Sequence, residues 1–193
     1  MNKQENQKGI VMIVSGPSGV GKSTICREAI KQIKNAYLSV SVTTRPKGKS
    51  EVDGQDYRFI SQQQFQQQID NDRLLEHAEI FGYLYGTPKD KVEQALQEGK
   101  VVILEIDIEG AKQAKAKYPQ AEMIFIFPPT QRELVERMKA RGREDAETVE
   151  KRLDRADREI AAAWQYYDHM VINDDLRQAV NEVVQIIRTS QRR

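Results

Sequence analysis

An apolar run that passes directly into a glycine-rich turn is the feature that most constrains the fold of this chain. Residues 9–14 (GIVMIV) are typical of a buried parallel strand. Residues 16–23 (GPSGVGKS) match the pattern GxxxxGK[ST] at every fixed position, and a helix-forming stretch, Lys22–Lys34, follows. Glycines let a backbone approach phosphate groups closely, and the N–H groups of such a turn point at them. The sequence therefore predicts a strand, a P-loop that holds a nucleoside triphosphate, and a helix.

Two side chains of this loop have chemistry of their own. We expect Lys22 to place a positive charge at the β- and γ-phosphates and Ser23 to offer its hydroxyl to Mg²⁺. The residues expected to bind ATP are Gly16, Pro17, Ser18, Gly19, Val20, Gly21, Lys22, Ser23 and Thr24. The loop does not identify the second substrate, because GTPases, ATPases and kinases share it. The sequence has no late Asn-Lys-x-Asp segment of the kind that recognises the base in GTPases, so a small kinase is favoured.

Three more apolar runs, each short enough to be a strand, recur along the chain at Val101–Ile106, Met123–Phe127 and His169–Ile172. Helical patterns lie before, between and after them, over Lys89–Glu98, Gln131–Ala140, Glu147–Tyr167 and Leu176–Arg188. Strands that alternate with helices predict an α/β fold of the P-loop NTPase type, with a parallel sheet covered by helices on both faces.

Residues 36–87 interrupt this alternation. Strand patterns over Leu38–Val42, Asp56–Ile60 and Leu74–Ile80 accompany a single short helix, Ser61–Asp70, and predict an inserted mixed β lobe. The charged stretch 141–150 between two helices predicts a mobile flap. We therefore expect one domain over residues 1–193, divided into a core (8–35, 88–140 and 155–193), an inserted lobe (36–87) and a helical lid (141–154).

The composition narrows the possible partners and the location. Lys and Arg number 30 against 29 Asp and Glu, so the net charge is +1 and gives no general attraction to nucleic acid or to an anionic membrane. The single cysteine, Cys26, excludes an internal disulfide and suits a reducing compartment. No apolar run is long enough to cross a bilayer, and the first eight residues lack the apolar centre of a secretion signal. We expect a cytoplasmic protein, either a monomer or a homodimer.

Polar side chains that suit an anionic acceptor gather in the inserted lobe. They lie in segments 41–45 (SVTTR), 53–57 (DGQDY), 75–78 (LEHA) and 83–87 (YLYGT). Glu105 and Asp107 stand at the carboxyl end of a central strand, which is where ligands bind in open α/β sheets.

The chain resembles the guanylate kinase family over nearly its whole length. The segments that carry the resemblance are GPSGVGKST, SVTTRP, EVDGQDY, LLEHAEIFGYLYGTP, VVILEIDIEG, ARGREDAETVEKRL and YDHMVINDD. Their order and spacing are similar to those of the family. The resemblance implies the reaction ATP + GMP → ADP + GDP with Mg²⁺, in guanine nucleotide metabolism.

The resemblance also implies a role for each matching residue. Arg45, Tyr57 and Tyr85 correspond to ligands of the GMP phosphate. Ser41, Glu76, Thr87 and Asp107 correspond to groups that recognise guanine. Three lid arginines, Arg137, Arg141 and Arg152, would act on the transferred phosphoryl group together with Lys22 and Arg45. The assignment of Glu76 is chemically sensible, because guanine presents N1–H and N2–H₂ as a pair of donors that a carboxylate can accept, and adenine does not.

Two positions depart from the family pattern. Gly48 stands where a second phosphate-binding arginine is usual. Lys47 or Lys49 could supply the charge but not the bidentate contact of an arginine, so we expect somewhat weaker GMP binding. Glu105 stands where Asp is usual. Two interpretations of Glu105 stay open: it helps Ser23 to hold the metal ion, or it satisfies a helix N-terminus or a water molecule.

Two other functions also stay open. A kinase of this fold could act on another phosphorylated acceptor, such as a ribose bisphosphate, and an acceptor without a base would leave Glu76 with no partner. Guanylate-kinase-like domains also serve as protein-interaction modules. Those modules typically lack an intact P-loop, whereas this chain keeps Lys22 and Ser23.

Overall fold

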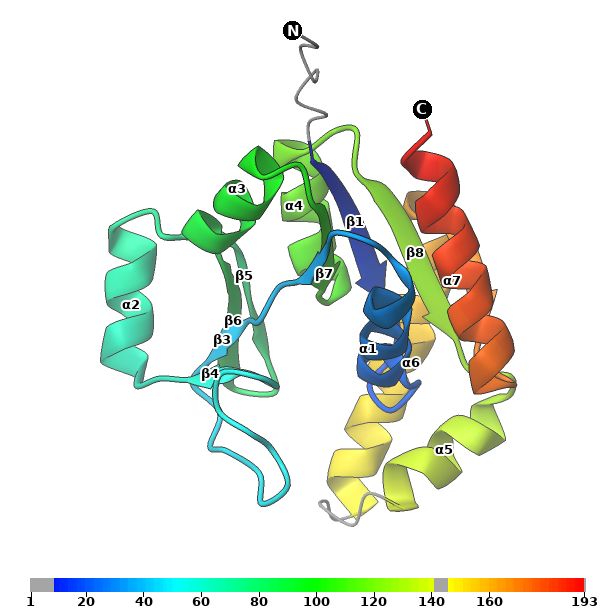
Figure 1. Ribbon diagram of the computed structural model, residues 1–193. Helices are drawn as coiled ribbons and strands as arrows, with labels where there is room; N and C mark the ends of the chain where they lie inside the picture. The colour runs from blue at the N-terminus through cyan, green and yellow to red at the C-terminus, as the bar shows by residue number, and fades with distance from the viewer. Residues whose placement is uncertain (1–8, 141–145, 193) are drawn as a thin grey trace, which may run out of the picture. The chain divides into compact units, whose positions relative to one another are not determined.

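The computed structural model describes residues 9–140 and 146–192 of the chain (Figure 1). A five-stranded sheet has the strand order β2-β7-β1-β8-β9, and its pairs β2–β7, β1–β8 and β8–β9 are parallel. The bounds of its strands are β1 Ile10–Ser15, β2 Ala36–Leu38, β7 Val101–Glu105, β8 Glu122–Phe127 and β9 His169–Ile172. The predicted α/β fold with a parallel sheet is confirmed.

A second sheet has four strands in the order β4-β3-β6-β5. Its strands are β3 Val42–Thr43, β4 Arg58–Phe59, β5 Leu74–Ile80 and β6 Tyr83–Pro88. The pair β3–β4 is parallel, whereas β3–β6 and β5–β6 are antiparallel. The predicted mixed β character of this segment is therefore confirmed.

The seven helices of the described residues follow the predicted pattern with one addition. Their bounds are α1 Lys22–Gln32, α2 Gln62–Asp70, α3 Lys89–Gln97, α4 Ile108–Lys117, α5 Gln131–Ala140, α6 Ala146–Tyr166 and α7 Leu176–Ser190. None of the described helices is both long enough and apolar enough to cross a membrane.

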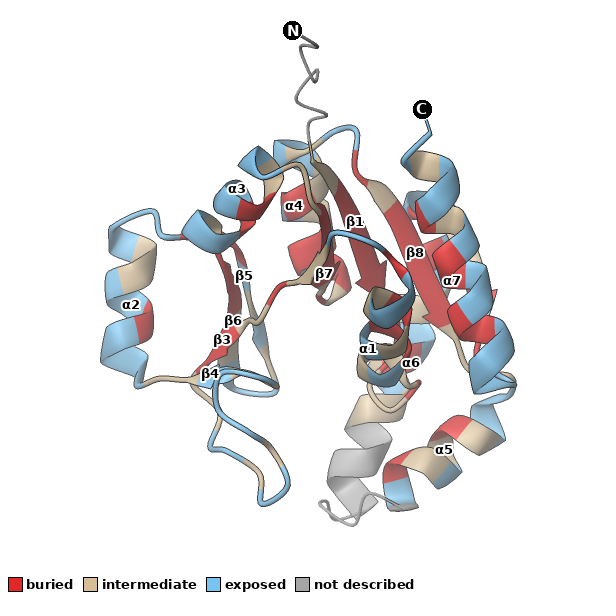
Figure 2. Cartoon of the chain, viewed as in Figure 1, coloured by how far each residue is buried: buried red, intermediate tan, exposed pale blue. Residues whose placement is uncertain are grey.

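The chain divides into two compact units, which we describe separately. The lobe unit comprises residues 9–11, 35–104 and 109–121. The P-loop unit comprises residues 12–34 and 105–108 and the described residues from 122 onward. The five-stranded sheet has its centre in strands that are buried along their length, as Figure 2 shows for β1 and β8. Burial on both faces explains why these strands are continuous apolar runs instead of alternating patterns.

Helix α7 illustrates how the P-loop unit is held together. Its buried residues, Ala179, Val180, Val183, Val184 and Ile187, recur with the spacing of one helix face, and this helix packs against α1. Asp175 caps its N-terminus by accepting a hydrogen bond from the backbone N–H of Gln178 at 2.8 Å. The lobe unit has a smaller separate core of Val42, Phe65 and Leu74, in which only Phe65 of helix α2 is fully buried.

The structure corrects several sequence expectations. The single predicted strand Leu38–Val42 is wrong: residues 36–38 form β2 of the five-stranded sheet, and residues 42–43 form β3 of the other sheet. Alternating apolar residues predict a strand without predicting its partner, so the change of sheet between Leu38 and Val42 was not visible. The strand predicted over Asp56–Ile60 is reduced to two residues.

Two elements were not predicted at all. Strand β6 contains Gly86 and Pro88, residue types that are depleted in strands. Helix α4 contains Gly110, and after Ile108 at its first position it buries only small residues, such as Ala111 and Ala114, so it lacks the apolar periodicity of a helix face built from large side chains. In the charged stretch 141–150, residues 141–145 lie outside the described part of the chain, and α6 begins at Ala146.

Candidate functional site

The P-loop joins β1 to α1 and takes its shape from three glycines with positive φ. Gly16, Gly19 and Gly21 have φ of 148°, 88° and 102°. Close approach as well as conformation requires glycine at two of them. A Cβ on Gly16 would lie 2.4 Å from the carbonyl oxygen of Ile126, and one on Gly21 would lie 2.5 Å from Nδ2 of Asn173. The loop therefore has little tolerance for any side chain at these positions.

Lys22 and Asn173 hold the loop from two directions. The Nζ of Lys22 donates to the carbonyl oxygens of Gly16 at 2.6 Å and Pro17 at 3.0 Å, which keeps the ammonium group against the turn. Asn173, buried at the end of β9, donates from Nδ2 to the carbonyl oxygen of Val20 at 2.7 Å. A positive charge and a fixed backbone are thus ready for an anionic ligand at the N-terminus of α1.

Ser23 and Glu105 meet beside the loop. The hydroxyl of Ser23 donates to Oε1 of Glu105 at 2.6 Å, and Glu105 ends strand β7. A hydroxyl and a carboxylate are the hard oxygen ligands that Mg²⁺ accepts, and Mg²⁺ commonly takes its remaining ligands from substrate phosphates and water. Among the described residues, no group of three His, Cys, Asp or Glu side chains is placed so that it could hold a metal ion by itself. The pair fits an ion that arrives with its nucleotide.

Burial keeps the thiol next to this pair inert. Cys26 is fully buried in α1, and its pKa is raised well above the ordinary value by burial and, to a smaller degree, by the charge of Glu105. The thiolate is the reactive form of cysteine, so Cys26 is a small core residue and not a nucleophile.

Two of the predicted lid arginines lie on described helices, Arg137 on α5 and Arg152 on α6. Arg137 of α5 donates to the carbonyl oxygen of Asn173 at 3.1 Å and forms an ion pair with Glu133 at 3.2 Å. Arg152 of α6 donates to the hydroxyl oxygen of Ser18 in the P-loop at 2.9 Å. Arg141 lies outside the described residues. Two of the three arginines therefore contact the loop itself or a residue that supports it.

Asp107 has a partner that the sequence did not single out. Oδ2 of Asp107 accepts a hydrogen bond from Nη2 of Arg155 at 2.6 Å, and Nε of Arg155 donates to Glu159 at 2.7 Å. Burial opposes the charge on Arg155, but the bonds to Glu159 and Asp107 outweigh it and raise the pKa of Arg155. Arg152 and Arg155 are three residues apart and share a helix face. This spacing was a signal that sequence analysis could have used.

In the lobe unit, Arg45 is surrounded by its own loop and by aromatic rings. Its Nη1 and Nη2 donate to Glu51 at 3.0 and 2.8 Å, and its Nε donates to the hydroxyl of Tyr85 at 3.1 Å. Its guanidinium carbon lies 5.4 Å from the ring centre of Tyr57. Burial would lower the pKa of Arg45, but the bonds to Glu51 and Tyr85 raise it above its ordinary value, so the group stays charged. Three predicted phosphate ligands are thus together.

Glu51 was missed by sequence analysis, and it explains the local role of Gly48. The backbone N–H of Gly48 donates to Oε2 of Glu51 at 2.7 Å. Glu51 therefore holds both the guanidinium of Arg45 and the backbone of the loop that follows it. Lys47 and Lys49 are exposed on this loop.

Glu76 and Thr87 form a buried pair on neighbouring strands. They face each other in the register of β5 and β6, and the Thr87 hydroxyl donates to Oε1 of Glu76 at 2.6 Å. Glu76 is only 4% exposed and Thr87 is 0% exposed. Tyr85 is two residues before Thr87 on β6 and so shares its face of the sheet. Ser41 directly precedes β3 and is half-buried.

The predicted residues thus form two groups. The P-loop unit holds the loop residues Gly16–Thr24 together with Glu105, Asp107, Arg137 and Arg152. The lobe unit holds Ser41, Arg45, Tyr57, Glu76, Tyr85 and Thr87. The first group can bind a polyphosphate and a cation. The second offers a fixed guanidinium, phenols and a buried carboxylate, which suit a smaller ligand with both an anionic end and hydrogen-bond donors.

Comparison with known proteins finds similar sequences and a similar structure. The family model described as guanylate kinase matches residues 8–190. A guanylate kinase of Carboxydothermus hydrogenoformans is 47% identical over 180 residues, which cover 93% of this chain and 88% of the relative. One from Desulfitobacterium hafniense is 45% identical, with coverage of 95% and 91%. The crystal structure of guanylate kinase from Anaplasma phagocytophilum has a TM-score of 0.82 at 31% identity and covers 97% of this chain and 88% of that one.

Proposed function

The chain belongs to the guanylate kinase family, and from this premise we propose how its two groups of residues divide the reaction between them. The protein is a phosphotransferase that moves the γ-phosphoryl group of ATP to GMP, giving ADP and GDP, for guanine nucleotide metabolism. ATP and GMP are its substrates. The roles of individual residues below are our proposal.

ATP lies on the P-loop residues Gly16–Thr24. The backbone N–H groups of the loop and the N-terminus of α1 surround the phosphates, and Lys22 bridges the β- and γ-phosphates. The contacts of Lys22 with the carbonyl oxygens of Gly16 and Pro17 support this role, since they already hold the ammonium group at the turn. Little reorganisation is then needed when the nucleotide arrives.

Mg²⁺ accompanies ATP, and Ser23 and Glu105 are the residues that would hold it, because their oxygens lie 2.6 Å apart beside the loop. When bound, the ion neutralises charge on the β- and γ-phosphates. Arg137, Arg141 and Arg152 add positive charge around the transferred group. We assign Arg141 and Arg152 to a lid over residues 141–154, the core to residues 8–35, 88–140 and 155–193, and the acceptor lobe to residues 36–87.

GMP binds through both of its ends. Arg45, Tyr57 and Tyr85 hold its phosphate, and Ser41, Glu76, Thr87 and Asp107 recognise its guanine. The phosphate approaches the guanidinium nitrogens of Arg45 that Glu51 contacts, so it competes with that carboxylate. A carboxylate accepts about four hydrogen bonds, so the Thr87 hydroxyl does not exhaust Glu76.

The chemical step needs no general base. An oxygen of the GMP phosphate, already largely ionised at neutral pH, forms a bond to the γ-phosphorus while the bond from that phosphorus to the β-phosphate oxygen breaks, and ADP leaves with the electron pair. Positioning and charge neutralisation by Lys22, Arg45 and the lid arginines therefore supply most of the rate enhancement. We place the reaction in the cytoplasm, which suits the reduced and buried thiol of Cys26, and leave monomer and homodimer as the two expected states.

The buried Glu76–Thr87 pair is the single observation that carries the assignment of guanine. Glu76→Gln replaces an acceptor with an amide whose NH₂ group would meet the donors of guanine. An unsatisfied buried group costs about 1–3 kcal/mol. We therefore expect kcat/KM for GMP to fall on the order of 10²-fold, with much smaller changes for AMP, CMP and UMP.

The matched control is Glu79→Gln, an exposed glutamate on the same strand. It should leave the kinetics with GMP unchanged. Steady-state rates with all four monophosphates test both variants. A near-normal kcat/KM of Glu76→Gln with GMP, or wild-type rates with AMP equal to those with GMP, would contradict the assignment.

A further inference from the structure

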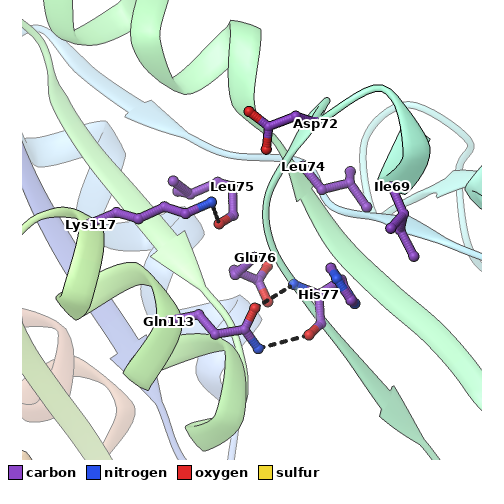
Figure 3. A pocket seen from close by; sticks show the side chains of 8 residues that line it. All are labelled: Ile69, Asp72, Leu74, Leu75, Glu76, His77, Gln113 and Lys117. Carbon is purple, nitrogen blue, oxygen red and sulfur yellow. Dashed lines mark hydrogen bonds between the residues drawn. The ribbon is translucent and has the colours of Figure 1, made fainter. Parts of the chain in front are cut away.

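Strand β5, which contains Glu76, is an edge strand of the four-stranded sheet. Its free edge faces helix α4, and β5 and residues 109–117 of α4 belong to the lobe unit. Figure 3 shows two side chains of α4, Gln113 and Lys117, that reach the backbone of this edge. These residues are four apart in sequence and therefore project from one face of the helix.

Gln113 pairs with the strand in the way that another strand would. Its Nε2 donates to the carbonyl oxygen of His77 at 2.8 Å, and its Oε1 accepts from the backbone N–H of His77 at 3.2 Å. Lys117 donates from Nζ to the carbonyl oxygen of Leu75 at 2.6 Å. Three edge groups of β5 are thus satisfied by side chains. An edge strand would otherwise expose these groups.

These contacts bracket Glu76, since Leu75 and His77 are its two neighbours in the chain. Side chains alternate across a strand, so the direction of the Glu76 carboxylate follows from the backbone on either side of it. Pairing with β6 and the buried side chains of Leu74 and Leu75 hold one side of this strand. On the side of α4, a pocket of about 120 Å³ lies along the same stretch, lined by residues that include Glu76, His77, Gln113 and Lys117. On that side, the polar contacts of Gln113 and Lys117 fix the edge of the strand.

We propose that Gln113 is a positioning residue for guanine recognition. It holds the backbone of His77 and thereby orients the carboxylate of Glu76, and Lys117 holds the backbone of Leu75 on the other side of Glu76 in the same way. The inference rests on the proposed role of Glu76 as a ligand of guanine. It adds a residue outside the substrate-contacting set, on a helix that begins directly after the proposed ligand Asp107.

The central experiment is Gln113→Ala, measured by steady-state kinetics. One lost pair of backbone contacts at an exposed site is a modest perturbation, so we expect the KM for GMP to rise about three- to tenfold. The kcat and the KM for ATP should change less than about twofold. The ratio of kcat/KM for GMP to that for IMP should also fall. IMP lacks the exocyclic amine whose hydrogen bond a correctly placed Glu76 accepts, so it depends less on the position of Glu76. A merely structural role would lower activity with both nucleotides equally.

Two further variants sharpen the result. Gln113→Glu keeps an acceptor for the His77 N–H but loses the donor to the His77 carbonyl oxygen, so it should resemble Gln113→Ala and not the wild type. Gln97→Ala removes an exposed glutamine near the end of α3 and should behave as wild type. Hydrogen exchange of the His77 amide should be faster in Gln113→Ala than in Gln97→Ala.

The double variant Glu76→Gln/Gln113→Ala separates this inference from the proposed function. If Gln113 acts through Glu76, the two effects on kcat/KM for GMP should combine to much less than their product. An unchanged KM for GMP in Gln113→Ala, or full multiplicativity in the double variant, would overturn the positioning role while leaving the role of Glu76 intact. If Glu76→Gln alone has no effect, the proposed function itself fails.

Discussion

The P-loop unit offers a phosphate ligand the backbone of consecutive residues, whereas the lobe unit offers side chains gathered from separate strands. Gly16 to Gly21 lie in one turn between β1 and α1, and Lys22 and Ser23 are the first residues of α1. Glu76 comes from β5, Tyr85 and Thr87 come from β6, and Arg45 follows β3. A backbone site does not depend on particular side chains, because every residue except proline has an N–H group. A side-chain site can distinguish one base from another, but each of its groups has to be positioned separately.

The two units also differ in the support behind their ligands. The P-loop follows a strand in which Ile13 and Val14 are completely buried, and α1 behind it packs against α7. The sheet that holds Glu76 has a small separate core, and its strands β3 and β4 are two residues long. If the proposed roles hold, the residues that select guanine belong to the smaller framework, in which few buried residues carry much of the stability.

Phe65→Ala should have the largest effect on local stability, because it removes a core residue of the lobe unit and leaves the P-loop unit unchanged. Phe65 is fully buried, and loss of a buried phenylalanine costs about 3–5 kcal/mol. We expect hydrogen exchange to accelerate in β3, β5 and β6 and to remain slow in β8. Gln63→Ala on the exposed face of α2 is the control. Equal acceleration in both units would show that they do not differ in local stability.

Lys22→Ala tests the opposite unit. Removal of one positioned charge from a phosphoryl-transfer site costs about 10²–10³-fold in kcat by analogy with other preorganised donors. Lys22 is half-buried and is not one of the core residues, so the melting temperature should change little. Lys31→Ala, an exposed position on the same helix, is the control. A kcat near that of the wild type would remove Lys22 from the reaction.

Arg155→Met tests whether α6 affects GMP binding through Asp107. The Arg155–Asp107 pair is 26% and 12% exposed, so its loss should matter more than that of a surface pair. We expect the KM for GMP to rise about tenfold, since Asp107 loses the partner that orients it. Arg158→Met on the same helix is the control, because Arg158 is exposed and bonds only within its helix in the contacts described. Isothermal titration with GMP provides an independent measurement. An unchanged affinity would exclude this coupling.

Gly48→Arg should have the smallest effect and would sharpen the comparison by strengthening the lobe. Gly48 is not among the glycines with positive φ, so its backbone accepts a side chain. A second guanidinium near Arg45 should lower the KM for GMP about two- to fivefold, with less effect at high salt. Lys47→Ala and Lys49→Ala in the chain with Gly48 would show which lysine, if either, contributes to GMP binding. A higher KM in Gly48→Arg would mean that the loop around Glu51 cannot accommodate the change.

The sequence predicted the P-loop well because its ligands are neighbours in the chain. The long buried strands and helices α5 to α7 were also predictable, since their apolar residues recur with a clear period. Strand β6 and helix α4 were missed because Gly86, Pro88 and Gly110 weaken the local signal, and both elements exist through their packing within the fold. The position of Ser41 between two different sheets had no local signal at all.

Contacts between distant residues explain the other omissions. Arg155 reaches Asp107 across 48 positions of the chain, and Gln113 reaches His77 across 36. No local pattern encodes such pairs. The pair of Arg45 and Glu51 is only six residues apart, but it depends on the course of an irregular loop. The candidate residues themselves could be predicted from motifs, whereas the groups that orient them required the structure.

The hydrogen bond from Asn173 to Val20 has a consequence for how the protein is made. Its two residues are 153 positions apart, so the ribosome completes the loop sequence long before it adds the residue that fastens it. At about 5–20 residues per second, that interval lasts roughly 8–30 s. During this time the nascent chain contains the ATP-binding motif but not the hydrogen bond from Asn173 that holds the loop. The growing polypeptide should therefore reach its full affinity for ATP only near the end of translation.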